Sequence, residues 1–245
     1  PARLSDIVAQ SQLPAETVRK ALHELVEEGG VEALTGEPIR LEWDGPLLIS
    51  AEGWRRLRER LTSILEDYHR RYPLRPGMAR QELKGRLEER GRRYSTRAYN
   101  EIIARAGREG VIEADNALVR KAGFRVAFTP EQEQSIQTLL AAFERQPYAP
   151  PSVADAVASV GADVFQALID QGRLVRVSED VVFSASAYEQ MVADVKAFIE
   201  REGSITIAQV RDLFRTSRKY ALALMEHLDA QRVTRRVGDV RVLRR

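Results

Sequence analysis

One local pattern occurs four times along the 245 residues of this chain. In each instance an amphipathic helical segment ends at a glycine or polar residue, and a short apolar segment follows. The residues at the break are Gly30, Gly110, Gly172 and Arg232. Glycine at a helix end adopts the left-handed conformation at little cost, so three of these positions are expected C-caps, with Arg232 as the exception. The repeat therefore predicts a string of small modules, each with a modest core.

The repeat divides the chain into four predicted domains, at residues 1–51, 52–128, 129–184 and 185–245. In the third, helices are expected near residues 131–143, 153–157 and 163–170, with a strand pair at 174–183. The first is the least regular, with Gly36, Pro38 and Gly45-Pro46 between its predicted strands.

The fourth domain gives the clearest pattern. Apolar residues at helical spacing between 191 and 199 predict a first helix, and Ile205 a short strand. Thr206 with Gln209 predicts a capping box that opens a second helix, and a third helix is expected to begin at Ser217. A tight hairpin follows, whose core-facing residues are expected to be Val233, Val237, Val240 and Val242.

Helix, strand, helix, helix and two-stranded wing is the order of a winged helix. We therefore expect a mostly α fold with small β-hairpins, built as four tandem winged-helix domains in an elongated arrangement.

Composition excludes several classes of protein. No apolar run approaches the roughly 20 residues of a membrane span, so no membrane partner is expected. The chain has no cysteine and three histidines, which excludes disulfides and thiolate zinc sites and fits a cytoplasmic location. No nucleophile, base and orienting group can be assembled, so we expect neither enzymatic activity nor a cofactor. Because the sequence begins at Pro1 without an initiator methionine, we expect a fragment of a longer protein.

Positive charge is concentrated at one end of the chain. Residues 211–245 contain ten basic and four acidic residues, a local excess of +6 in a chain whose net charge is only +2. Residues 129–184 contain three basic and eight acidic residues, which would repel a phosphate backbone. Only the fourth domain combines a basic helix start with a basic wing, and this predicts nucleic-acid binding there.

The candidate nucleic-acid-binding residues lie at the start of the third helix and on the wing of this domain. Cations at a helix N-terminus oppose the helix dipole unless an anion such as phosphate is present. The candidates are Arg215, Ser217, Arg218, Lys219, Tyr220, Arg235, Arg236, Gly238 and Arg241.

Each candidate has a structural alternative. Arg218 and Lys219 could be a solvated helix end, and Tyr220 could be partly buried between helix and wing instead of stacking on a base. The wing arginines could decorate an edge strand, and Gly238 could serve turn geometry alone. A second basic cluster between Arg86 and Arg97 is interleaved with glutamates, which favours a salt-bridged helix over an RNA contact.

The fourth domain resembles the C-terminal end of the bacterial selenocysteine-specific elongation factor SelB. The resemblance rests on Ser217-Arg218-Lys219, Thr234-Arg235-Arg236 and Gly238-Asp239 at this spacing, and the four tandem units agree with that factor's C-terminal extension. This chain departs from a purely basic wing at Asp239.

The resemblance implies that the fourth domain recognises the selenocysteine insertion hairpin (SECIS) of messenger RNA while the other domains act as a spacer. GTP would bind the missing N-terminal domain, selenocysteyl-tRNA would be held mainly by missing domains, and the ribosome is a candidate partner of a monomeric chain. No Gly-x-x-x-x-Gly-Lys-Ser/Thr loop occurs, which agrees with a missing GTPase. Two alternatives stay open: a tandem winged-helix DNA-binding regulator and a protein-interaction scaffold.

Overall fold

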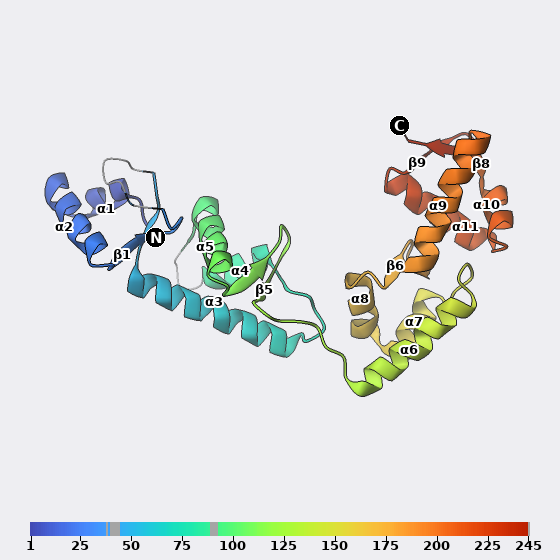
Figure 1. Cartoon of the computed structure of the whole chain (residues 1–245), viewed down its shortest axis with the longest axis horizontal. Helices are drawn as coiled ribbons and strands as arrows, with labels where there is room; N and C mark the ends of the chain where they lie inside the picture. The colour runs from blue at the N-terminus through green and yellow to red at the C-terminus, as the bar shows by residue number, and fades with distance from the viewer. Residues whose placement is uncertain (38, 40–44, 89–92, 245) are drawn as a thin grey trace. The chain divides into compact units, whose positions relative to one another are not determined.

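The computed structural model describes residues 1–244 except 38, 40–44 and 89–92, so the prediction for Pro38 lies outside the described residues. The chain divides into two compact units, Pro1–Val126 and Ala127–Arg245 (Figure 1). Each unit contains two of the predicted domains, which are called modules 1 to 4 below. The boundaries between modules 1 and 2 and between 3 and 4 stay predictions, as does the elongated arrangement.

The first unit begins with two helices and a two-stranded sheet, after which a long helix leads into module 2. Module 2 then contains a three-stranded antiparallel sheet in the order β3-β5-β4. The elements are α1 (Leu4–Gln10), α2 (Ala15–Glu27), β1 (Val31–Ala33), β2 (Leu48–Ser50), α3 (Ala51–Arg71), β3 (Met78–Ala79), α4 (Arg80–Leu87), α5 (Thr96–Arg108), β4 (Ile112–Ala114) and β5 (Leu118–Lys121).

In the second unit module 4 shows the complete winged-helix order, and module 3 shows three helices and a two-stranded wing without a described strand between α6 and α7. Module 3 ends in a two-stranded sheet, and module 4 has a three-stranded antiparallel sheet in the order β8-β10-β9. The elements are α6 (Pro130–Arg145), α7 (Val153–Val160), α8 (Ala162–Asp170), β6 (Leu174–Arg176), β7 (Val182–Ser184), α9 (Ala185–Glu202), β8 (Ile205–Thr206), α10 (Ile207–Leu213), α11 (Arg218–Ala230), β9 (Thr234–Val237) and β10 (Val240–Leu243). The helices predicted for modules 3 and 4 and the capping box of Thr206 are confirmed.

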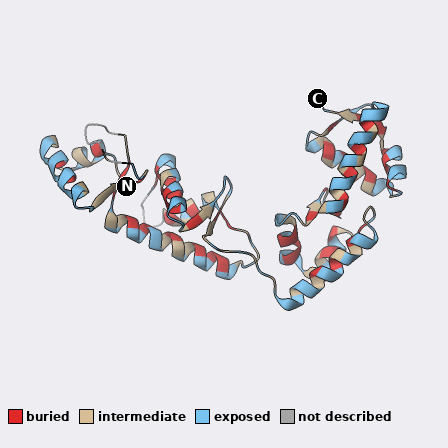
Figure 2. Cartoon of the chain, in the orientation of Figure 1, coloured by how far each residue is buried: buried red, intermediate tan, exposed pale blue. Residues whose placement is uncertain are grey.

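Helix α3 begins because the Ser50 hydroxyl accepts a hydrogen bond from the amide of Gly53, and its apolar residues return every three to four positions. Figure 2 shows the resulting buried stripe along α3 and along α9, with exposed residues on the opposite side. In unit 1 this stripe packs against residues of both modules, from Leu34 to Val119. Residues of module 1 thus join the core of module 2, which buries more apolar surface than module 2 could alone, while Leu4, Val18, Leu22 and Leu48 form a separate cluster within module 1.

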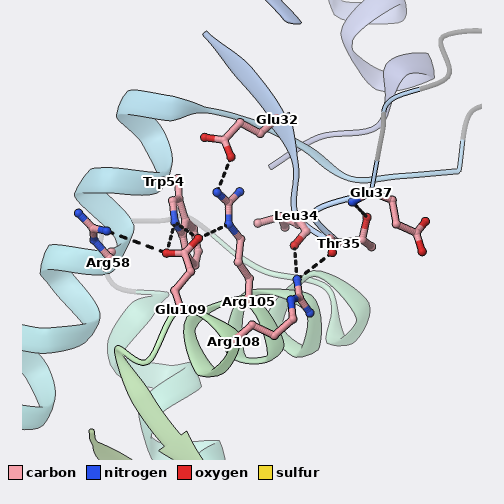
Figure 3. Close-up of polar contacts among 9 residues, drawn as sticks. All are labelled: Glu32, Leu34, Thr35, Glu37, Trp54, Arg58, Arg105, Arg108 and Glu109. Carbon is pink, nitrogen blue, oxygen red and sulfur yellow. Dashed lines mark hydrogen bonds and ion pairs between the residues drawn. The ribbon is translucent and has the colours of Figure 1, made fainter. Parts of the chain in front are cut away.

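A polar network closes the junction between modules 1 and 2 (Figure 3). Arg105 on α5 is 7% exposed, and it donates hydrogen bonds to Glu32 on β1 (2.5 Å) and to Glu109 (2.8 Å). The guanidinium lies 4.4 Å from the ring centroid of Trp54, whose indole nitrogen also donates to Glu109 at 2.9 Å. Arg108 donates to the carbonyls of Leu34 and Thr35. A charge buried this deeply is tolerated because it is paired and hydrogen-bonded.

The four breaks of the sequence repeat are structurally equivalent, with one correction. Gly110 and Gly172 adopt the predicted positive φ, but in module 1 the left-handed residue is Gly29 (φ +71°) and not Gly30. The prediction for Gly30 was one residue late because two glycines are adjacent and either could take the position. Arg232 occupies the same place in module 4 with φ +59°, in spite of its side chain.

The valines predicted to face the core of module 4 include a second error. Val237 is 49% exposed, whereas Thr234 and Arg241 are buried. In the register Thr234↔Leu243 and Arg236↔Arg241, these residues share one sheet face and Val237, Val240 and Val242 share the other. The apolar pattern predicted the wrong inner face, because the face toward α11 holds the ion pair of Arg241 with Asp229 in place of valines.

Candidate nucleic-acid interface

The start of α11 carries cations and has an unused cap. Ser217 is the N-cap residue in extended backbone geometry, but its side chain makes no capping hydrogen bond. Serines or threonines cap α3, α5, α6, α7, α9 and α10 with such a bond. The first turn of α11 contains Arg218 and Lys219 and no acidic residue. This helix end is therefore suited to an anion, which would satisfy its amide groups and offset the two cations.

Arg215 precedes this helix in an unfavourable backbone conformation. Its φ is +49°, and it and Arg232 are the two non-glycine residues with positive φ in the described parts of the chain. The conformation is fixed by the tight turn between α10 and α11, where the amide of Arg215 donates to the carbonyl of Asp212 at 3.3 Å. The turn exposes the side chain of Arg215 next to the N-terminus of α11.

Tyr220 is half-buried, as its structural alternative predicts, but it packs against module 3 and not between helix and wing. Its hydroxyl donates a 2.7 Å hydrogen bond to the carbonyl of Pro150, and its ring lies 6.1 Å from that of Phe183. Burial, followed by the charge of Asp155, raises the pKa of Tyr220. The side chain thus anchors the first turn of α11 to module 3.

The wing presents two arginines on the exposed edge strand β9. Arg235 and Arg236 are both exposed, and the Nε of Arg236 donates to the carbonyl of Gly238 at 2.9 Å. Gly238 has φ +60°, as the hairpin turn requires, and a Cβ at this position would lie in open space. Turn geometry therefore accounts for Gly238, and Asp239 beside it is exposed.

Arg241 does not lie on this surface, so its prediction as a binding residue is corrected. It is 4% exposed, and its Nε lies 3.4 Å from the Oδ2 of Asp229 on α11. The other oxygen of Asp229 accepts a 2.7 Å hydrogen bond from the hydroxyl of Thr234. Asp229 therefore joins the sheet to α11, and Arg241 is a structural residue of module 4.

Module 3 contributes contacts to the interface that the sequence did not reveal. The hydroxyl of Thr216, immediately before the N-cap, donates to the carbonyl of Tyr148, and the ring of Tyr148 lies 5.0 Å from that of Phe214. Val177, Val181 and Phe183 belong to the same buried cluster as the core of module 4. The Thr216–Tyr148 hydrogen bond spans 68 positions, and no local pattern marks either partner.

Two members of the second basic cluster form ion pairs, in agreement with the salt-bridge interpretation, whereas no ion pair is described for the exposed Arg93. Arg86 contacts Glu82 at 2.7 Å and Arg97 contacts Glu101 at 2.8 Å, each four residues apart on its helix. Arg97 also donates to the carbonyl of Gly45 in module 1. Arg90 and Arg92 lie outside the described residues.

The part of the chain that the structure describes contains no group of three or more histidine or acidic side chains able to hold a metal ion. None of the helices in this part of the chain combines the length and apolarity needed to cross a bilayer.

Two family models described as the winged helix of elongation factor SelB match this chain, one at residues 62–120 and the other at residues 197–243. The selenocysteine-specific elongation factor of Desulfomicrobium baculatum is 27% identical over 188 residues, which cover 74% of this chain and 29% of that protein. The chain therefore spans less than a third of the length of this relative.

Two solved structures are also similar. The mRNA-binding domain of elongation factor SelB from E. coli in complex with SECIS RNA is 25% identical with a TM-score of 0.39, and the match covers 48% of this chain and all of that one. A bacterial selenocysteine-specific elongation factor, EF-Sec, is 13% identical with a TM-score of 0.45, covering 96% of this chain and 41% of the other.

Proposed function

We propose that this chain carries the winged-helix region of a SelB-family elongation factor, which its similarity to two SelB winged-helix models and one relative supports, and that module 4 binds the selenocysteine insertion hairpin of a messenger RNA. The observation that carries the proposal is the group of exposed cations around the uncapped start of α11. Arg215, Arg218 and Arg235 are exposed and make no ion pair with any residue that the structure describes. Module 4 thus leaves its positive charge available to phosphate, whereas module 2 pairs Arg86 and Arg97 internally.

The chemistry of RNA limits how this surface is used. The major groove of an A-form helix is too narrow to admit α11, so recognition must occur at a loop or bulge and along the backbone. A phosphate would lie at the free amides of the first turn, beside Ser217 and Arg218, while the wing arginines follow the backbone. The log of the affinity falls linearly with the log of the salt concentration. Each phosphate that the protein neutralises should make this slope steeper by somewhat under one unit.

Modules 3 and 4 form the binding unit together in this proposal. Tyr220 and Thr216 are anchored on module 3, so the geometry of the helix start depends on both modules. Modules 1 and 2 act as a spacer toward the GTPase and tRNA-binding domains of the full-length factor. The fragment itself has no enzymatic activity and no cofactor, and it acts as a monomer in the cytoplasm, with the ribosome as a candidate partner.

Single substitutions test the surface. In equilibrium binding to a bulged RNA hairpin, Arg218→Ala or Arg236→Ala should weaken affinity by about 1–3 kcal/mol if the guanidinium contacts a base, and by less if it contacts only phosphate. Arg201→Ala is the matched control, because it removes an equal charge from the last turn of α9 in the same module. Affinity unchanged by both Arg218→Ala and Arg236→Ala would show that the surface is wrongly placed.

A further inference from the structure

The charge of module 3 is opposite to that of the surface it anchors. Residues 129–184 contain eight acidic and three basic side chains, yet this module packs directly against the basic module 4. A passive spacer needs no such charge. The arrangement raises the question of what the acidic side chains do beside a phosphate-binding helix.

Two carboxylates of module 3 face the first turn of α11. Asp180, at the turn between β6 and β7, has an oxygen 4.0 Å from the Nζ of Lys219. Asp155, in the first turn of α7, lines the same surface depression as Tyr220. The hydroxyl and amide of Ser152 lower the pKa of Asp155, and Lys219 lowers it further, so this carboxylate is ionised at neutral pH and acts electrostatically on α11.

The nearby cations of module 3 do not cancel these charges. Arg176 donates to the carbonyls of Ser178 and Glu179, so it stays on the tip of its own hairpin, where Glu179 adds a further exposed carboxylate. Arg145 lines the depression with Asp155. Asp155, Glu179 and Asp180 thus exceed Arg145 and Arg176 by one negative charge on this side of α11.

The carboxylates are held in place by the packing of the two modules. The Tyr220–Pro150 and Thr216–Tyr148 hydrogen bonds fix α11 against the α6–α7 connection, and Val181, next to Asp180, is buried in the shared core. The Lys219–Asp180 pair itself adds little stability, because the side chains are 53% and 78% exposed. Its electrostatic effect is therefore felt mainly by an approaching polyanion.

We propose that Asp155 and Asp180 are specificity-determining residues of the RNA site, which keep phosphates off the module 3 side of α11. The inference rests on the proposed function. An RNA bound by charge alone can lie across the surface in many orientations, including over these carboxylates. A hairpin whose loop is read at α11 and the wing takes one orientation, away from module 3. The carboxylates thus weaken non-specific binding more than hairpin binding.

The test uses the 245-residue chain. It compares the Asp180→Asn variant and the Asp155→Asn/Asp180→Asn double variant with the parent in equilibrium binding to two RNAs. One is a bulged hairpin with an exposed loop, and the other is a fully paired RNA duplex with the same number of phosphates. Asp163→Asn on α8 is the matched control, because Asp163 is an exposed acid of the same module with no described ion pair to α11. Asp180→Asn is the cleaner variant, since Asp155 also caps α7.

The expected result is a rise in duplex affinity of roughly two- to fivefold for Asp180→Asn, the range for one exposed ion pair, with less than a twofold change for the hairpin. Asp163→Asn should leave both affinities within twofold. Equal changes for the two RNAs, or equal effects of Asp163→Asn and Asp180→Asn, would overturn the inference. Failure of the proposed function is recognised separately, because the parent chain would then show no preference for the hairpin over the duplex.

Discussion

Arg232 occupies a backbone conformation that glycine adopts in the other three modules, and this predicts that Arg232→Gly stabilises the protein. The equivalence is defined by hydrogen bonds as well as by φ. The amide that follows the left-handed residue donates to the carbonyl five residues earlier, as in Gly30 to Leu25 and Val233 to Leu228. Arg232 is exposed and makes no ion pair with a described residue. Its side chain therefore forms no ion pair that would offset the cost of the left-handed backbone conformation.

The magnitude follows from two opposing terms. A non-glycine residue in the left-handed region costs about 1–2 kcal/mol, which the substitution removes. Glycine also gains conformational freedom in the unfolded chain, which offsets about 0.4–1 kcal/mol of that gain. The middles of the two ranges give a net stabilisation of about 0.8 kcal/mol. The reverse change, Gly172→Ala, should cost about 1 kcal/mol from backbone conformation alone, because an added Cβ meets no atom within 4 Å.

The chain offers an internal control for this assay. Both tryptophans, Trp43 and Trp54, precede residue 127, so tryptophan fluorescence follows the first unit while far-ultraviolet circular dichroism follows both. In urea unfolding, Arg232→Gly should raise the midpoint of the second unit by roughly 0.4 M and leave the fluorescence transition unchanged. An unchanged or lower midpoint in the circular dichroism transition would refute the argument that Arg232 is strained.

Three other predictions concern contacts described above. Tyr220→Phe removes the hydrogen bond to the carbonyl of the buried Pro150 and should lower the free energy of unfolding of the second unit by about 1 kcal/mol, measured by urea unfolding. An unchanged unfolding midpoint would show that the bond is not formed in solution. Arg241→Met should cost about 2–3 kcal/mol of stability without weakening RNA binding by the folded protein, and a selective loss of RNA affinity would return Arg241 to the binding surface. Hydrogen bonds from Gly123, Arg120 and Arg125 lower the pKa of Glu113 to about 2. The ionised carboxylate therefore makes its full contribution to folding stability above the usual pKa of 4.5, and this contribution is lost as the pH falls toward 2. As the pH is lowered from 4.5 toward 2, the midpoint of urea unfolding should therefore fall less steeply for Glu113→Gln than for the parent chain. Parallel curves would contradict the assigned role of Glu113.

The sequence predicted the fold where local signals were sufficient. Helical periodicity, the capping box at Thr206 and the glycines at helix ends identified the winged-helix order of modules 3 and 4. The sequence could not predict that residues of one module join the core of the next, as Leu34 and Phe183 do. The Arg105–Glu32 and Tyr220–Pro150 contacts join residues about 70 positions apart, and nothing local to either partner specifies them.

The exposure of most candidate binding residues could be predicted from the sequence, whereas long-range contacts could not. Arg215, Arg218, Lys219, Arg235 and Arg236 are exposed as a basic surface requires, because charged side chains remain in water unless a partner is available. Arg241 has such a partner in Asp229, twelve residues earlier on another element, so counting charges alone mistook this buried residue for an exposed one. The strand pattern failed there because a buried ion pair replaced the expected valines.

Equilibrium binding of the full chain to a bulged hairpin RNA with an exposed loop, compared with paired RNA and duplex DNA of equal length over a salt series, tests the central claim most directly. The account predicts a preference for the hairpin that persists as salt rises, because contacts to bases are screened less than contacts to phosphate. Equal affinity for all three nucleic acids at every salt concentration would contradict it, and preference for duplex DNA would favour a DNA-binding regulator.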